Sequence, residues 1–329
     1  MNTKKNRLFL VGGFLTLAFG AGVPQVFAQH DAEDLQASIP EETTLATETV
    51  RIPFELKANK IYIETMINGK GPFPFIFDTG ASVTVIDQSL TEELGLEKIG
   101  KSEIGDPSGS QQISVDLVRI NALQAGGLMA KGFEASSWDR GDLYQRMQTP
   151  PKGIIGFPVF HEFLLTIDYE ASELVVTRGS LSPADDHVIA YTAPMGIAEM
   201  ECTVNGRSVT THLDTGGPHG VMVPESVLEK GDLEGDPIVV GRARTVNSEF
   251  EIKAAHLNGS IEIAGHRVED PVIMLNSLYD AVNFGYGFLK HFRVTFDQAS
   301  ELVRFEPLSD QPIQLKMPQM RHGGPQRRH

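Results

Sequence analysis

Along most of this chain, hydrophobic and polar residues alternate with a period of two, which is typical of β-strands with one buried face. Residues 198–204 and 292–297 are clear cases, and Cys202 falls on the apolar side of the first. A helix-like pattern is limited to 89–96 and to 224–230, where Pro224 suits a first helical turn. The pattern therefore predicts an all-β fold with two short helices.

The pattern also occurs twice, which indicates an internal repeat. Residues 163–175 and 292–303 each contain an alternating strand, a polar Ala-Ser-Glu turn and a second apolar run, so each predicts a hairpin. Upstream, the Asn-Gly pairs at 68–69 and 205–206 each mark a tight turn before a β-rich run. We expect two similar lobes of mainly antiparallel strands, related by a pseudo-twofold axis, with a cleft between them.

The first copy is longer than the second, and we place its extra residues in a loop at 136–152, where Arg140, Gly141 and the pair Pro150-Pro151 interrupt the strand pattern. The boundaries of the repeats then divide the chain. We expect a signal peptide over 1–28, an acidic leader over 29–50, a first lobe over 51–178, a linker over 179–186, a second lobe over 187–307 and a flexible tail over 308–329.

The N-terminus has the pattern of an export signal. Three basic residues among the first seven precede an apolar run from 8 to 23, and Val26 and Ala28 suit a cleavage site before Gln29. The alternative is an uncleaved anchor, but the run is interrupted by glycines and is shorter than the ~20 residues of a spanning helix. We expect an exported protein, periplasmic or secreted, without stable membrane association after cleavage.

The leader over 29–50 holds six acidic residues and no basic or aromatic residue. This composition is typical of a solvated, disordered segment rather than of a core element. Two interpretations remain open, a plain linker and a propeptide.

Composition excludes several classes of function. The formal net charge is −15, and no basic surface offsets it before the last few residues, which argues against a nucleic-acid partner. Cys202 is the only cysteine, so no intramolecular disulfide forms. His322 and His329 in the tail are too sparsely placed for a metal site, and we expect neither a metal nor an organic cofactor.

The residues that indicate a chemical function are two copies of Asp-Thr-Gly, which begin at Asp78 and Asp214. Each aspartate ends an apolar strand and enters a turn whose glycine permits close backbone approach. If the two loops meet, the carboxyls must share one proton, because two like charges about 3 Å apart cannot both ionise. One carboxyl then activates water as a general base and the other donates a hydrogen bond to a carbonyl.

With these motifs the chain resembles the pepsin and retroviral-protease superfamily, over most of both repeats. The resemblance implies peptide-bond hydrolysis with Asp78 and Asp214 as catalytic residues and a polypeptide as substrate. It also implies that hydrophobic residues and a glycine pack behind each loop, although Asn283 departs from that pattern. The supporting positions are Thr79, Gly80, Ala81, Thr215, Gly216 and Gly217 in the loops, and Ile154, Ile155, Gly156, Phe284 and Gly285 behind them.

The family also closes a hairpin flap over its substrate. Gly105, Gly109 and Ser110 belong to a turn-rich tip at the corresponding place, and 241–247 is the matching stretch of the second copy. Neither tip carries a tyrosine, which makes the retroviral type the nearer comparison. An ordinary surface hairpin is the alternative. His161 and His219 lie near these motifs, and we expect them to have packing or surface roles.

The sequence thus predicts an aspartic endopeptidase that works as a monomer, because one chain supplies both lobes. One alternative is an inactive peptide-binding module of the same fold. Another is a glycosidase with two carboxylates, which does not explain the duplicated Asp-Thr-Gly context.

Overall fold

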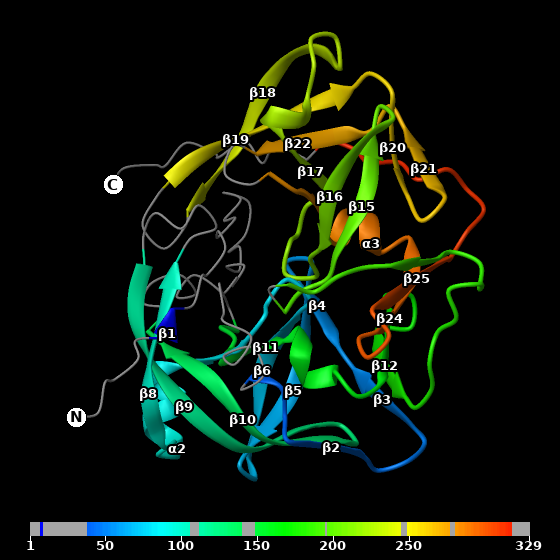
Figure 1. Cartoon of the computed structure of the whole chain (residues 1–329). Helices are drawn as coiled ribbons and strands as arrows, with labels where there is room; N and C mark the ends of the chain where they lie inside the picture. Colours follow the sequence, from blue (N-terminus) through cyan, green and yellow to red (C-terminus); the bar gives the residue numbers. More distant parts are fainter. Residues whose placement is uncertain are drawn as a thin grey trace, which may run out of the picture.

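The computed structural model describes residues 7–8, 38–105, 112–139, 149–194, 196–244, 249–276 and 280–317. Nearly every regular element in these ranges is a β-strand, and the strands form two lobes joined by a shared sheet (Figure 1). The expectation of an all-β chain with two similar lobes is confirmed.

The first lobe is a ten-stranded sheet in which β9 pairs with both β8 and β10 and also with β5, so that the sheet closes on itself. β11 runs parallel to β6 and brings Gly156 opposite Asp78. The elements are β1 (Arg7–Leu8), β2 (Glu42–Leu45), β4 (Glu55–Lys57), β5 (Lys60–Ile67), β6 (Lys70–Asp78), β7 (Thr84–Asp87), α2 (Gln88–Leu94), β8 (Lys98–Gly105), β9 (Gln112–Ala125), β10 (Leu128–Trp138), β11 (Gly153–Gly156) and the 3₁₀-helix η2 (Phe157–Phe160).

The second lobe repeats this arrangement in a nine-stranded sheet. β23 runs parallel to β16 and antiparallel to β17, as β11 does to β6 and β7. The elements are β15 (Glu199–Val204), β16 (Arg207–Leu213), β17 (Val221–Pro224), the 3₁₀-helix η3 (Glu225–Val227), β18 (Leu233–Arg244), β19 (Glu249–Leu257), β20 (Ser260–Ile263), β21 (His266–Glu269), β22 (Val272–Asn276), β23 (Val282–Phe284) and α3 (Tyr286–Leu289).

A six-stranded sheet joins the lobes and contains both predicted hairpins. Its order is β14 (Val188–Ala190), β25 (Leu302–Pro307), β24 (Phe292–Asp297), β12 (Leu164–Asp168), β13 (Glu173–Thr177) and β3 (Thr49–Pro53). At its centre Thr166 pairs with Thr295, and their hydroxyls lie 2.8 Å apart. These two threonines are equivalent positions of the repeat, so the pseudo-twofold axis passes between them.

One hydrophobic cluster runs through both lobes and the shared sheet. Phe157 of the first lobe meets Phe296 of the second edge to face, with ring centroids 4.9 Å apart. Cys202 is buried in the strand β15, as its position in the alternating pattern predicts, and it is free. Packing rather than a disulfide therefore holds the lobes together.

The expectation of a disordered leader is wrong for residues 38–50. β2 pairs with β10 of the first lobe, and β3 forms the edge of the shared sheet. Thr43 and Val50 are buried because successive residues of a paired strand face opposite sides of the sheet, and the acidic composition gave no sign of this. Removal of a propeptide that extends to residue 50 would remove β2 and the first part of β3. Residues 29–37 lie outside the described ranges.

The two expected helices have different outcomes. α2 covers 88–94, and the Asp87 side chain accepts a hydrogen bond from the Ser89 backbone N–H at its start. The second is wrong, because only the 3₁₀ turn η3 forms and Leu228 returns to an extended conformation. There the Asp232 carboxylate accepts a hydrogen bond from the Glu229 backbone, which stabilises a turn instead of a further helical turn.

The insertion of the first lobe begins later than expected. β10 continues through Trp138, because 135–138 pair in parallel with β7, so the extra residues fall within 139–152. The tail is also more ordered than expected up to residue 317. Leu315 packs against the core, and its carbonyl accepts a hydrogen bond from Val272.

Of the expected signal peptide, only β1 is described, and it pairs in parallel with β8. The rest of 1–28, the insertion residues 140–148 and the tail from 318 lie outside the described ranges. No helix in the described part of the chain is long and apolar enough to cross a membrane.

Candidate active site

The structure brings Asp78 and Asp214 together at the junction of the lobes. Asp78 ends β6 and Asp214 follows β16, and both carboxyls are fully buried. A Cβ on Gly80 would lie 3.2 Å from Oδ1 of each aspartate, which shows how closely the carboxyls approach. A Cβ on Gly216 would overlap the Asp78 carboxyl. Only glycine leaves room for the pair.

The two threonines hold the first aspartate loop (residues 78–82) and the second (214–218) together. Thr79 Oγ1 donates to the Leu213 carbonyl over 2.7 Å and accepts from the Thr215 backbone N–H over 3.1 Å. Thr215 Oγ1 in turn donates to the Phe77 carbonyl over 3.0 Å and accepts from the Thr79 backbone N–H over 3.0 Å. The two threonines therefore join the lobes through four mutual hydrogen bonds.

Each loop rests on a glycine from the strand behind it. A Cβ on Gly156 would lie 2.6 Å from the Val83 carbonyl carbon, and one on Gly285 would lie 2.6 Å from the Gly217 oxygen. Both contacts are with backbone, which cannot move aside as a flexible side chain can. Ile154, Ile155 and Phe284 are fully buried, and the backbone N–H groups of Phe157 and Tyr286 hold the carbonyls of Ala81 and Gly217.

Burial favours the neutral form of both carboxyls. It raises the pKa of Asp78, against hydrogen bonds from backbone N–H groups and the charge of Lys60. Burial, with repulsion from Asp78, raises the pKa of Asp214 well above its ordinary value. The Gly80 N–H donates to Asp78 Oδ1 and the Gly217 N–H to Asp214 Oδ1, each over 2.8 Å. The arrangement is a buried carboxyl pair in which both pKa values are raised, which favours a proton shared between the two aspartates.

A family model described as aspartyl protease matches residues 63–159 and 200–287, which together are more than half of the chain. The chain belongs to the aspartyl protease family. Each matched region contains one Asp-Thr-Gly loop and its supporting glycine, so the family assignment and the geometry concern the same residues. A search of curated proteins gives no match.

Asn283, the departure from the family pattern, has a partner in the fold. Its Oδ1 lies 2.9 Å from Nε2 of His219, and both side chains are buried. Burial lowers the pKa of His219 to about 4, so the ring is neutral and donates to the amide at neutral pH. A polar pair thus replaces the expected apolar contact behind the second loop. His161 is half-buried and ends η2.

Lys60 is a member of this aspartyl-protease site that the sequence analysis missed. Its side chain is fully buried, and Nζ donates to the Gly216 carbonyl over 2.6 Å. The ordinary signal for a site residue is absent, because Lys60 lies in a strand without a motif, 156 residues from its partner. The one local sign is its position at the start of β5, opposite the end of β6 where Asp78 lies.

Both flap candidates belong to hairpins. β8 and β9 pair up to Gly105 and Gln112, and β18 pairs with β19 up to Arg244 and Glu249. Figure 1 shows these two hairpins extending toward the same side of the lobes. The tips, with Gly109, Ser110 and residues 245–248, lie outside the described ranges, so the flap assignment stays a prediction.

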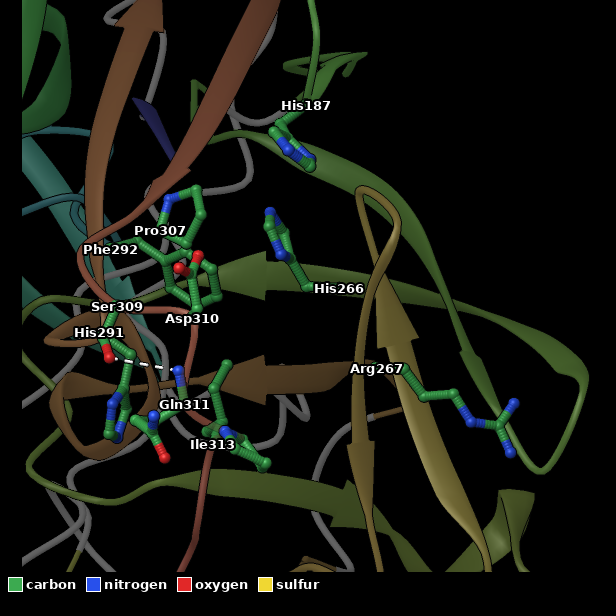
Figure 2. A pocket seen from close by; sticks show the side chains of 11 residues that line it. His187, His266, Arg267, His291, Phe292, Pro307, Ser309, Asp310, Gln311 and Ile313 are labelled. Carbon is green, nitrogen blue, oxygen red and sulfur yellow. Dashed lines mark hydrogen bonds between the residues drawn. The ribbon is translucent and has the colours of Figure 1, made fainter.

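The second lobe also has a pocket of about 370 Å³ away from the aspartates. Figure 2 shows His187, His266 and His291 on its wall, and the rings of the first two stack with centroids 4.4 Å apart. No aspartate-loop residue lines it. Among the described residues, no group of three or more histidine, cysteine or acidic side chains is arranged to hold a metal ion.

Proposed function

We propose that this family member is an aspartic endopeptidase that hydrolyses peptide bonds with a water molecule activated by Asp78 and Asp214. The observation that carries the proposal is the buried carboxyl pair, built from both lobes and held by reciprocal threonine hydrogen bonds. A single-lobe fold or an incidental pair of turns does not require such contacts.

The two carboxyls hold one proton between them and act as acid and base. The ionised carboxyl is the general base that takes a proton from water, and the protonated one donates to the scissile carbonyl oxygen. Oδ2 of both aspartates is buried and accepts no hydrogen bond from the described residues, so the protein itself leaves the lone pairs of these two atoms unused.

We also propose that the substrate is an extended peptide, bound along the strand edges and the two hairpins β8–β9 and β18–β19. Backbone pairing of this kind suits many sequences, and side-chain preference then comes from the pockets next to the aspartates. Export is part of the proposal and rests on the N-terminal basic and apolar pattern. N-terminal sequencing of the protein recovered from cells would find Gln29 first if the signal is cleaved.

The experiment is a peptide-library digest with purified residues 29–329, run from acidic to neutral pH. A double variant Asp78→Asn/Asp214→Asn, purified in the same way, controls for contaminating peptidases. Cleavage by the wild type alone supports the proposal. Peptide binding without cleavage by the wild type would instead identify an inactive binding module.

A further inference from the structure

We propose that Lys60 is a positioning residue of the active site, which supplies the positive charge that balances the ionised aspartate pair and holds the second aspartate loop through the Gly216 carbonyl. Its kinetic test rests on the proposed peptidase function, but a second test does not.

The first step is the position of Lys60 in the sheet. β5 and β6 are antiparallel, and Ile61 pairs with Phe77, so Lys60 is next to Asp78 along the same register. Residues directly opposite each other project from the same face of a sheet. Lys60 is therefore part of the first-lobe sheet itself, and it does not belong to the leader that a propeptide cleavage would remove.

The second step is what the side chain reaches. Nζ donates to the carbonyl of Gly216, a residue of the opposite lobe, over 2.6 Å. The adjacent Asn59 also contacts this loop, with Nδ2 3.4 Å from the Pro218 carbonyl. Lys60 thus adds a cross-lobe hydrogen bond to those of the threonines, and it fixes the loop that carries Asp214.

The third step is charge. Lys60 is 0% exposed, and the titratable groups around it are Asp78 from β6, Asp214 from the second loop, and His219, which follows that loop. Tyr169, which follows β12, faces the two aspartates as well. A buried carboxyl pair with one proton carries a net negative charge, and burying an unbalanced charge is costly. With Lys60 protonated and His219 neutral, the buried cluster has no net charge.

The protonation state supports this balance. Burial lowers the pKa of Lys60 to about 8, against the opposing effect of Asp214 and Asp78. The ammonium group is therefore charged at acidic and neutral pH. Its charge lowers the pKa of both carboxyls relative to a site without it.

The kinetic test compares the pH profile of kcat/KM for the wild type, Lys60→Met and Lys57→Met. Methionine removes the charge but keeps most of the side-chain length, so both limbs of the profile should move to higher pH by about 1 to 3 units. Lys57 lies opposite Lys60 on the same hairpin but pairs with the exposed Glu55, so its removal should leave the limbs in place. A lower rate with unmoved limbs in Lys60→Met would show a merely structural role and overturn the proposal.

The second test needs neither activity nor a folded Lys60→Met variant. Isotope-labelled lysine signals are titrated by NMR in the wild type and in Asp78→Asn/Asp214→Asn. Lys60 should titrate near pH 8 in the wild type and about 1 unit or more lower in the double variant, because the coupling between the charges is reciprocal. An unchanged Lys60 titration overturns the proposal even if the protein cleaves peptides, and a shifted one supports it even if the protein cleaves none.

Discussion

At Gly156, the effect of a steric clash can be measured separately from backbone strain. Its backbone is extended, with φ −75° and ψ 158°, so alanine would cause no strain in the backbone itself. The added Cβ would meet the Val83 carbonyl at 2.6 to 2.7 Å, and this backbone supports the first aspartate loop. The effect of a substitution therefore measures how tightly the loop is packed.

We expect Gly156→Ala to lower the free energy of unfolding by about 1–3 kcal/mol, the usual range for overpacking. Urea denaturation measures it. Gly100→Ala is the matched control, because its Cβ would find its nearest neighbour, Leu117, at 3.9 Å. That variant should be as stable as the wild type or slightly more so. Equal stabilities of the two variants would show that the contact behind the loop is not rigid.

At the proposed catalytic residues we expect Asp78→Asn and Asp214→Asn each to reduce kcat/KM by about 10³-fold or more, at the upper end of the range for general acid–base catalysis. Each carboxyl is half of one proton-sharing unit, so the double variant should be little worse than either single one. Steady-state kinetics with thermal denaturation as a folding control test this. Near-normal turnover in either single variant contradicts a site shared by the lobes.

Ala81 and Gly217 determine a prediction about pH. Neither has a hydroxyl that could donate to the nearby carboxylate, and such a donor would lower the pKa of the pair. Burial raises both pKa values, so each limb of the profile moves upward from the ordinary aspartate range. We expect a bell-shaped kcat/KM profile centred at about pH 5 to 6. An optimum below about pH 3.5 on a soluble peptide would contradict this account.

At the scale of elements, β2 and β3 show that the leader belongs to the fold. β2 adds to β10, and β3 closes one edge of the shared sheet, where Val50 is 4% exposed. A chain that begins at residue 51 loses all of β2 and the first part of β3. It would retain the aspartate loops but lose the pairing of β2 with β10 and part of the pairing of β3 with β13.

We expect the chain that begins at 51 to be less stable than one that begins at 38 by about 2 kcal/mol or more, since burying one valine alone contributes about 1.5–3 kcal/mol. Urea denaturation of the two chains gives the difference. Equal stability, with equal or higher peptidase activity of the shorter chain, would identify the leader as a removable propeptide.

At the scale of the whole molecule, the shared sheet and the aspartate loops are completed within one chain. The Thr166–Thr295 pair and the hydrogen bonds of Thr79 and Thr215 join the two lobes within one chain. In a dimer of single lobes, the same contacts would have to form between two chains. The protein should therefore be active as a monomer. We expect constant specific activity on dilution and a monomer mass by sedimentation. A loss of activity on dilution that surface adsorption does not explain would indicate an obligate dimer.

Features that are local in the sequence were predicted well. The Asn-Gly turns, the two hairpins and the buried position of Cys202 follow from short-range patterns, because turn chemistry and strand alternation act over a few residues. The glycines behind the loops were implied by the family resemblance, and the repeat then located the second one at Gly285. The cysteine count also excluded a disulfide within the chain.

What only the tertiary structure decided concerns contacts between distant residues. Lys60 reaches Gly216 across the lobes, and Asn283 meets His219, although nothing next to these residues in the sequence marks them. The same holds for β2 and β3, whose composition indicates disorder until partner strands provide their hydrogen bonds. The sequence alone determined which chemistry the chain can carry. Packing between the lobes decided how deeply the aspartates are buried and which charge stands beside them, because burial depends on residues far apart in the sequence.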